Sequence, residues 1–381
     1  MELRPQFEQF LRDIRPSERH KEEWKMGSRT LRERLDADPV LSPLIVASFL
    51  QGSVRRSTAV RPTGGKRSDV DVVVVTKIDH NADQPAVAME RFEPFLNRHY
   101  PGKWKQQDRS FGIELSYVDL DLVVTALPTD PTARAKLEEL YRSKAVETTK
   151  SLEDLTGWRL SKSWNPDTSG LAAFSSTATD DTVPDADWKP HPLMLPDRAV
   201  KKWGPTHPLA QIKWTADKNR ACNGHYINVV RALKWWRHEH ADKLPKYPKG
   251  YPLEHMIGHV FPDDTRCLAQ GVTLAFEGLR DKFGLSAQLG IVPYLADHGV
   301  PTHNVLKRLE PKDFTAFINA ATAAADTARK ALDSQDAEES GGFWQELFGT
   351  SFSLPGPQGG DRARGFTAPT VAAQPKTDRF A

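Results

Sequence analysis

The sequence predicts an α+β fold in which a mixed sheet, braced by a long N-terminal helix, joins an α-helical domain. Three observations predict this fold. Residues 69–78 and 111–128 are rich in β-branched side chains and are typical of strands. Residues 84–100 between them have apolar side chains at helical spacing. From residue 208 to 348 helical periodicity dominates, which predicts the second domain.

The N-terminal segment predicts a helix that extends to about Asp38. Ser17 is a suitable N-cap, and Trp24, Leu31 and Leu35 recur near helical spacing among charged neighbours. We therefore expect a long amphipathic helix to open the fold.

The chain divides into three predicted parts. Residues 1–205 form the sheet domain with its N-terminal helix, and residues 206–348 form the helical domain. Within the first part, residues 165–188 are too polar for a core and predict an ordered loop or lid. Residues 349–381 are rich in Pro, Gly, Ala and Thr and predict a flexible tail, because few large apolar side chains are present to offset the entropy of ordering.

Composition excludes several classes of protein. The 381 residues carry a formal net charge of +2, so no global field indicates nucleic acid binding. Cys222 and Cys267 are too few for a disulfide framework and fit a reducing compartment, so we expect a cytoplasmic protein. No apolar stretch approaches the roughly 18 residues that span a bilayer, and no signal peptide is apparent, so we expect no membrane.

Two aspartates stand one residue apart at the start of the first predicted strand. Side chains two apart in a strand face the same side, so Asp69 and Asp71 converge while Val70 and Val72 face the other way. Such carboxylates repel each other unless a divalent cation binds them, and Mg²⁺ prefers hard oxygen ligands. The pair predicts a metal site.

A third acid is needed to bridge two metal ions about 3.5 to 4 Å apart, the arrangement used in phosphoryl transfer. The second strand offers Asp119 and Asp121, which share one face, so periodicity leaves the choice open. Upstream, Gly52 and Ser53 follow an apolar segment, where backbone N–H groups and a hydroxyl can approach phosphate. The alternative is a solvent-facing strand whose acids pair with nearby basic residues, namely Arg55, Arg56, Lys66 and Arg67.

The ordered Gly-Ser, Asp-x-Asp and later Asp motifs resemble the polymerase-β-like nucleotidyltransferases. Among these the chain is similar to bacterial CD-NTases, relatives of cyclic GMP-AMP synthase, and most similar to their clade D. The resemblance covers nearly the whole chain. It rests on the stretches IRPSERHKEEWKMGSRTLRERL, FLQGSVRRSTAVRP, KRSDVDVVVVT, SFGIELSYVDLDLVVTA, THPLAQIKWTADKNR and KYPKGYPLEHMIG. It implies a bilobed molecule with nucleotides bound in the cleft between the lobes.

The resemblance also assigns roles to residues. It implies that Asp69, Asp71 and Asp121 are catalytic and hold two Mg²⁺ ions, which Mn²⁺ can replace, with Asp121 also as base and Asp119 as a neighbour. Gly52 and Ser53 match the loop that binds the donor triphosphate. Lys234 matches a lysine that holds triphosphate oxygens, although a solvated helix charge is the alternative. Relatives such as cyclic GMP-AMP synthase place a phosphate-binding serine where this chain has Gly250, before Tyr251.

The implied activity is synthesis of a cyclic oligonucleotide second messenger from ATP and GTP in CBASS antiphage defence, where the product activates an effector. Clade membership favours a cyclic trinucleotide such as cyclic AMP-AMP-GMP, and a cyclic dinucleotide stays open. Two other functions also stay open: transfer of a single nucleotide to an RNA end or protein, and a catalytically silent nucleotide-binding module. Retention of all three acids argues against the silent module.

Partners follow from the same resemblance. The tail ending KTDRFA is similar to substrates that an E1–E2-like ligase joins through the C-terminal residue, here Ala381. An idle linker is the alternative for this tail, and regulation by HORMA and AAA proteins is the competing partner arrangement.

Weaker signals have plainer explanations. His255 and His259, with Cys267 or His225, have spacing that could bind zinc, but packed or solvated histidines are more common. Trp235 and Trp236 are candidates for base stacking, although we expect at least one in the core. The basic stretch at residues 54–67 could bind a nucleic acid activator, but we favour triphosphate binding.

Overall fold

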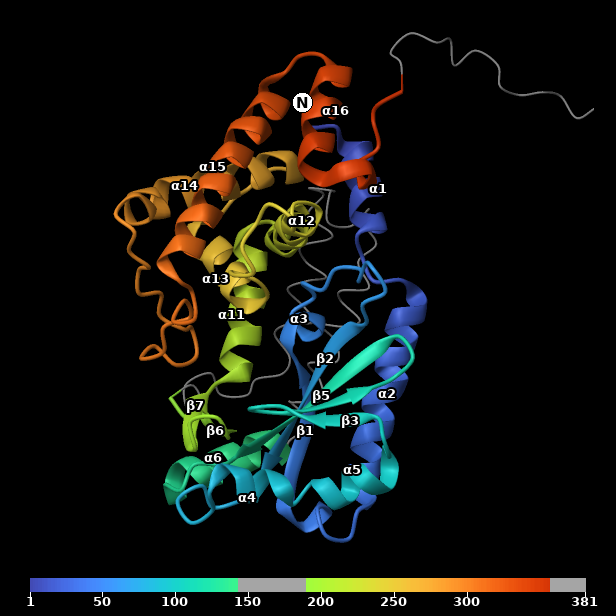
Figure 1. The fold of residues 1–381 in the computed structure, drawn as a ribbon, viewed down its shortest axis with the longest axis vertical. Coiled ribbons are helices and arrows are strands. Elements are labelled where there is room, and N and C mark those ends of the chain that lie inside the picture. The colour runs from blue at the N-terminus through green and yellow to red at the C-terminus, as the bar shows by residue number, and fades with distance from the viewer. Residues whose placement is uncertain (143–189, 357–381) are drawn as a thin grey trace, which may run out of the picture.

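The computed structural model describes residues 1–142 and 190–356. The expected lid at 165–188 and the conjugation residue Ala381 lie outside these ranges. The sheet and its covering helices occupy one end of the molecule, and a bundle of helices occupies the other (Figure 1). The predicted α+β fold class is therefore confirmed.

One mixed sheet forms the first part of the molecule. Its strands run in the order β1-β2-β5-β4-β3, and β6 extends it by pairing with both β5 and β7. Strands β2 and β5 are parallel and the other pairs are antiparallel. The strands are β1 (Ile45–Gln51), β2 (Ser68–Thr76), β3 (Trp104–Gln106), β4 (Phe111–Glu114), β5 (Val118–Ala126), β6 (Leu193–Asp197) and β7 (Lys202–Thr206).

Both faces of the sheet are covered, as the alternation of each strand requires. Helix α2 (Glu18–Ala37) lies across one face, where Leu31 and Leu35 pack in one core with Val70 and Leu120 (Figure 1). The shorter helices of this part are α3 (Gly52–Arg55), α4 (Pro85–Glu90), α5 (Glu93–His99) and α6 (Pro131–Arg142), with a 3₁₀ turn at Ser42–Leu44. Helix α6 packs on the opposite face, where Tyr141 stacks on Phe49.

The N-terminal segment contains two helices rather than one. Ser17 caps α2 as predicted, because its side chain accepts a hydrogen bond from the backbone N–H of His20. A separate helix, α1 (Arg4–Asp13), precedes it. We assigned residues 1–205 to the sheet domain, but Phe7 and Phe10 of α1 are fully buried in the core of the helical part. The amphipathic face of α1 therefore places the first residues in the second domain.

Six helices form the rest of the described chain. They are α11 (Pro208–Ala221), α12 (Tyr226–Glu239), α13 (Tyr251–Val260), α14 (Leu268–Gln288), α15 (Pro311–Asp333) and α16 (Ala337–Phe348). We expected the tail to begin at 349, but a 3₁₀ turn at Gly349–Ser351 continues the fold and Phe352 is fully buried against Phe7 and Trp344. Packing therefore extends at least to Phe352. No helix among residues 1–142 and 190–356 is long and apolar enough to cross a membrane.

Candidate active site

Four aspartates lie on one face of the sheet where β2 runs beside β5. In the parallel register Asp69 lies opposite Asp119, and Asp71 lies opposite Asp121. Val70, which lies between Asp69 and Asp71 in β2, faces the core under α2. The four acids therefore share the other face of the sheet. The structure thus brings Asp69, Asp71 and Asp121 together from two strands that are 50 residues apart in sequence.

The electrostatics of this cluster are unfavourable for charged acids. Desolvation raises the pKa of Asp69 to about 7, with a further contribution from Asp71 and then from Asp121. Desolvation followed by Asp71 raises the pKa of Asp121 to about 6. Desolvation also raises the pKa of Asp71, although the nearby Arg56 opposes it. In the described part of the chain no ion pair or hydrogen bond neutralises the Asp69 carboxylate.

The donor set fits a hard cation. It consists of carboxylate oxygens that are partly dehydrated and repel one another, which is the environment Mg²⁺ would stabilise. As the side chains stand, no three His, Cys, Asp or Glu residues in ranges 1–142 and 190–356 are grouped closely enough to hold a metal ion. Binding would therefore need rotamer changes among these acids.

Asp119 and Asp121, which periodicity could not separate, have different partners. The Arg67 guanidinium lies 3.2 Å from Asp119 Oδ1 and also contacts Glu114 at the exposed edge. Gln107 instead donates from Nε2 to Asp121 Oδ1 at 2.9 Å. Asp119 is thus paired with a cation, whereas Asp121 is oriented by a neutral amide that leaves its charge uncompensated.

Gln107 is a site residue that the sequence reasoning missed. Its Oε1 accepts a hydrogen bond from Ser110 Oγ at 2.8 Å, which fixes the amide. Gly112 lies opposite Asp121 in the ladder, and a Cβ there would come within 2.7 Å of Gln107 Nε2. The glycine in the FGIE stretch was the available signal, because it allows this close approach.

Gly52 and Ser53 begin the short helix α3 directly after β1. Gly52 has φ +74°, and a Cβ there would lie 1.8 Å from Asp71 Oδ2. Only glycine therefore lets the backbone pass so close to the acid. The carbonyl of Ser53 accepts backbone N–H groups from Thr58 at 2.8 Å and Ala59 at 3.2 Å, which fixes the turn.

A buried ion network joins the two parts of the molecule beside this turn. Arg56 Nε lies 3.0 Å from Glu254 Oε2, and Lys234 Nζ lies 2.6 Å from Glu254 Oε1. Lys234 also donates to the carbonyl of Thr58 at 3.0 Å. The Arg56 guanidinium lies over the ring of Tyr251, 5.0 Å from its centroid. The side chains of Arg56 and Glu254 are only 6% and 4% exposed.

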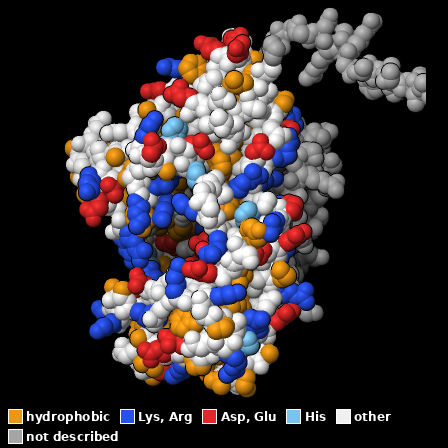
Figure 2. All heavy atoms as spheres, turned by 45° about the vertical axis from the view of Figure 1, so that its right-hand side comes forward, with side chains coloured by type: hydrophobic (Ala, Val, Ile, Leu, Met, Phe, Trp, Pro, Cys, Tyr) orange, Lys and Arg blue, Asp and Glu red, His pale blue; other side chains and the backbone are white. Residues whose placement is uncertain are grey.

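This network shows that Lys234 is buried and adds Arg56 and Glu254 to the candidate site. Lys234 is not a solvated helix charge, because it is largely buried in ion pairing. Arg56, for which the sequence predicts surface pairing with the acids or, within residues 54–67, triphosphate binding, pairs with Glu254, a residue without a predicted role. Together the two cations hold the pKa of Glu254 down to about 2 against the effect of burial. Space-filling atoms show a hollow between the two parts, with Lys and Arg side chains around it (Figure 2).

The weaker candidates have structural roles in this protein. Trp236 packs edge-on against Phe276, and Trp235 donates to the carbonyl of Phe348, so neither exposes a face to a base. His255 donates from Nε2 to the carbonyl of Ala296 at 2.8 Å. Cys267 caps α14 through its sulfur. Burial lowers the pKa values of His225 and His255 to about 4, and His259 belongs to no metal-binding group of described residues.

Comparisons with known proteins identify the family of the chain. Residues 1–134 match the Second Messenger Oligonucleotide or Dinucleotide Synthetase domain. The chain is 53% identical to the cyclic AMP-AMP-GMP synthase of Enterobacter hormaechei, covering 100% of both chains. It is 55% identical to a probable cyclic AMP-AMP-GMP nucleotide synthase of Salmonella paratyphi B, again over 100% of both, and 26% identical to the cyclic AMP-AMP-AMP synthase of an Acinetobacter strain, over 92% of this chain and 86% of the relative.

Solved structures show the same fold. The CD-NTase CdnG of Bradyrhizobium diazoefficiens, in complex with GTP, aligns with a TM-score of 0.62 at 12% identity, over 91% of this chain and 95% of that one. CdnC of Escherichia coli MS115-1, in complex with HORMA-deltaN, aligns at 0.58 with 16% identity, over 92% and 98%. With full-length identity above one half to two synthases, the chain belongs to the CD-NTases, the nucleotidyltransferases that synthesise cyclic oligonucleotides.

Proposed function

We propose that this enzyme joins ATP and GTP into cyclic AMP-AMP-GMP in a Mg²⁺-dependent reaction. The observation that carries the proposal is the cluster of uncompensated carboxylates beside the Gly52 turn. The two relatives that share more than half of its residues over their full length support the product. We further propose that the product serves CBASS antiphage defence by activating an effector, and that the enzyme acts in the cytoplasm.

In this proposal Asp69, Asp71 and Asp121 hold two Mg²⁺ ions, for which Mn²⁺ can substitute. Bound there, the ions would neutralise triphosphate charge and make a ribose hydroxyl more acidic. Asp121, oriented by Gln107, accepts the proton of that hydroxyl, whose oxygen attacks the donor α-phosphorus. Each attack forms one phosphodiester and releases pyrophosphate, and three attacks close a ring of three nucleotides.

The backbone and cations beside the acids bind the donor triphosphate. Gly52 and Ser53 supply a bare, fixed turn next to Asp71. Lys234 carries three N–H donors, of which, within residues 1–142 and 190–356, Glu254 and the carbonyl of Thr58 use two. The third is left for a phosphate oxygen, so Lys234 can bind triphosphate without breaking its present contacts. Glu254 is then a positioning residue that fixes Lys234 and Arg56.

We also propose that an E1–E2-like ligase acts on the C-terminal residue Ala381. Regulation by HORMA and AAA proteins is the other arrangement, and the HORMA complex of the structurally similar CdnC supports it. The clade D assignment remains a prediction.

The catalytic proposal predicts that Asp69→Asn and Asp121→Asn each lower product formation at least about a thousandfold, because each removes a ligand charge worth several kcal/mol. Chromatography and mass spectrometry of reactions with ATP, GTP and Mg²⁺ measure the phosphatase-resistant product. Asp119→Asn is the matched control and retains activity. An inactive Asp119→Asn with an active Asp121→Asn would show that the wrong acid was chosen, and a single transferred nucleotide in place of a ring would contradict the proposed product.

The raised pKa values predict an unusual pH dependence of stability in the metal-free protein. The folded protein retains protons on Asp69 up to about pH 7, whereas the unfolded chain releases them near pH 4. This contribution to stability is therefore present at low pH and is lost as pH rises from about 4 to 7. In EDTA, the urea midpoint of the wild type falls relative to that of Asp69→Asn between about pH 4 and 7.

Added Mg²⁺ raises the wild-type midpoint at pH 8 but has little effect on Asp69→Asn, because the metal relieves the repulsion that the variant lacks. Asp281→Asn, which removes an exposed carboxylate of α14, is the control. Its urea midpoint changes in the same way as that of the wild type, both in EDTA and with added Mg²⁺. A midpoint difference that does not vary with pH would count against coupled acids at this position.

The ion network predicts that Glu254→Gln destabilises the fold by about 3 to 5 kcal/mol, because two buried cations lose the one carboxylate with which each pairs among the described residues. Lys234→Met leaves Glu254 paired with Arg56, so its main effect is a rise of about tenfold in the KM for the donor nucleotide. Urea unfolding and initial rates measure the two effects. Glu277→Gln, whose partner Arg329 is 42% exposed, is the control and costs less than about 1 kcal/mol. Similar losses for Glu254→Gln and Glu277→Gln would refute the role of the network.

The tail proposal predicts a covalent adduct at Ala381 when the protein is co-expressed with an E1–E2-like ligase that accepts CD-NTases. Intact-mass and peptide mass spectrometry locate the adduct. A chain lacking Ala381 remains unmodified and still makes product, because the deletion leaves the catalytic acids in place. Recovery of only free C-termini from the wild type would reject conjugation.

A further inference from the structure

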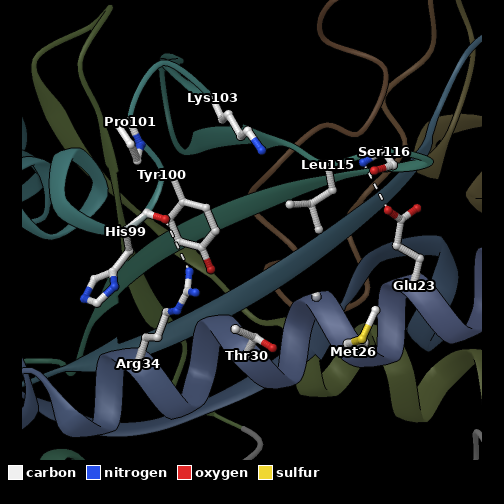
Figure 3. A pocket seen from close by; sticks show the side chains of 11 residues that line it. Glu23, Met26, Thr30, Arg34, His99, Tyr100, Pro101, Lys103, Leu115 and Ser116 are labelled. Atoms are coloured by element: carbon white, nitrogen blue, oxygen red, sulfur yellow. Dashed lines mark hydrogen bonds between the residues drawn. The ribbon is translucent and has the colours of Figure 1, made fainter.

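A second concave site lies on the face of the sheet opposite the catalytic acids. It is a pocket of about 470 Å³ between helix α2, the turn that follows α5 and the turn that precedes β5 (Figure 3). Its volume falls in the range of small-molecule sites. Residues of α2 form one wall, and the same helix packs against Val70, whose neighbours in β2 carry the catalytic carboxylates on the other face. The pocket is therefore separate from the proposed nucleotide site.

The body of the pocket is apolar and open. Met26 is 66% exposed although it is a large apolar side chain, and Leu115 faces it across the pocket (Figure 3). Tyr100 closes one end. Gly27 on α2 allows Leu115 to approach the helix closely, because a Cβ there would lie 2.6 Å from Leu115 Cδ1. A flat apolar group fits between the flexible Met26 and these neighbours.

Two cations border this apolar space without a carboxylate partner in the described chain. Lys103 extends its ammonium group toward the centre of the pocket (Figure 3). The Arg34 guanidinium lies 5.2 Å from the ring centroid of Tyr100 and donates to the carbonyl of His99 at 3.3 Å. Neither forms an ion pair among residues 1–142 and 190–356.

The one acid of the pocket is already used by the turn. Glu23 accepts backbone N–H groups from Ser116 at 3.0 Å and from Tyr117 at 2.6 Å. Its carboxylate thus binds the backbone N–H groups of the turn rather than the two cations. The pocket therefore combines a positive potential with apolar side chains. An anion would meet charge-assisted hydrogen bonds from Lys103 and Arg34 in a partly dehydrated setting.

We propose that this pocket is a second ligand site, which binds a small molecule with a flat aromatic body and an anionic group. The aromatic body packs between Met26, Leu115 and Tyr100, and the anion contacts Lys103 and Arg34. The site does not depend on the proposed synthesis, because none of its residues touches the catalytic acids.

Titration with 1-anilinonaphthalene-8-sulfonate tests the proposal, because this probe combines a flat aromatic body with one sulfonate and fluoresces when it leaves water. The full-length protein binds it at one saturable site per chain. Thr30→Trp, which places a ring inside the pocket from an accessible position of α2, abolishes that site. Lys103→Gln weakens binding roughly tenfold by removing one charged donor.

Lys105→Gln is the matched control, because Lys105 is exposed two residues further along and pairs with Glu114 outside the pocket. It leaves the affinity within about twofold of the wild type. Three results would overturn the proposal: no saturable binding by the wild type, unchanged binding in Thr30→Trp, or equal weakening by Lys103→Gln and Lys105→Gln. Thermal melts establish that each variant is folded. Since no product is measured, these outcomes are independent of the catalytic proposal.

Discussion

The parallel pairing of β2 with β5 is the constraint on which the rest of the structure depends. It sets Asp69 opposite Asp119 and Asp71 opposite Asp121, although like charges directly opposite in a sheet are destabilising. The register persists because the same strands bury Val70, Val72 and Leu120 on the other face. A shift by one residue would expose those side chains and bury the acids, so the hydrophobic face holds the charged face in place.

The surrounding residues offset the negative charges of these four aspartates to different degrees. Arg67 pairs with Asp119 at the exposed edge, and Arg56 opposes the effect of desolvation on Asp71. Among the described residues, Asp121 accepts a hydrogen bond from the neutral amide of Gln107, and Asp69 has no hydrogen bond or ion pair. The remaining repulsion is therefore concentrated on Asp69 and Asp121. Perturbed carboxylates of this kind are typical of catalytic sites, because a bound cation and substrate can relieve the repulsion.

Local patterns in the sequence were enough to predict β2, the Ser17 cap and the shared face of the acids, because each depends on residues a few positions apart. Residues 111–128, predicted as one strand, form the antiparallel strands β4 and β5, and the other strands of the sheet were not predicted. Glu254 could not be predicted in this way. It meets Arg56 across 198 residues, and nothing in the helical pattern around it distinguishes a buried ion pair from a solvated charge. Helix α1 was assigned to the wrong domain for the same reason, since its amphipathic pattern shows that one face is buried but not against which partner.

The Arg56, Glu254 and Lys234 network also limits how the two lobes can move. Two cations share one carboxylate, so the network keeps an excess positive charge beside the Gly52 turn, where a triphosphate would bring negative charge. Separating the lobes at this point would strand Arg56 or Glu254 without its partner, which is costly for groups so deeply buried. Tyr251, packed under the Arg56 guanidinium, adds to the same contact. The lobes are therefore fixed to each other beside the Gly52 turn, and any opening between them must occur farther from this junction.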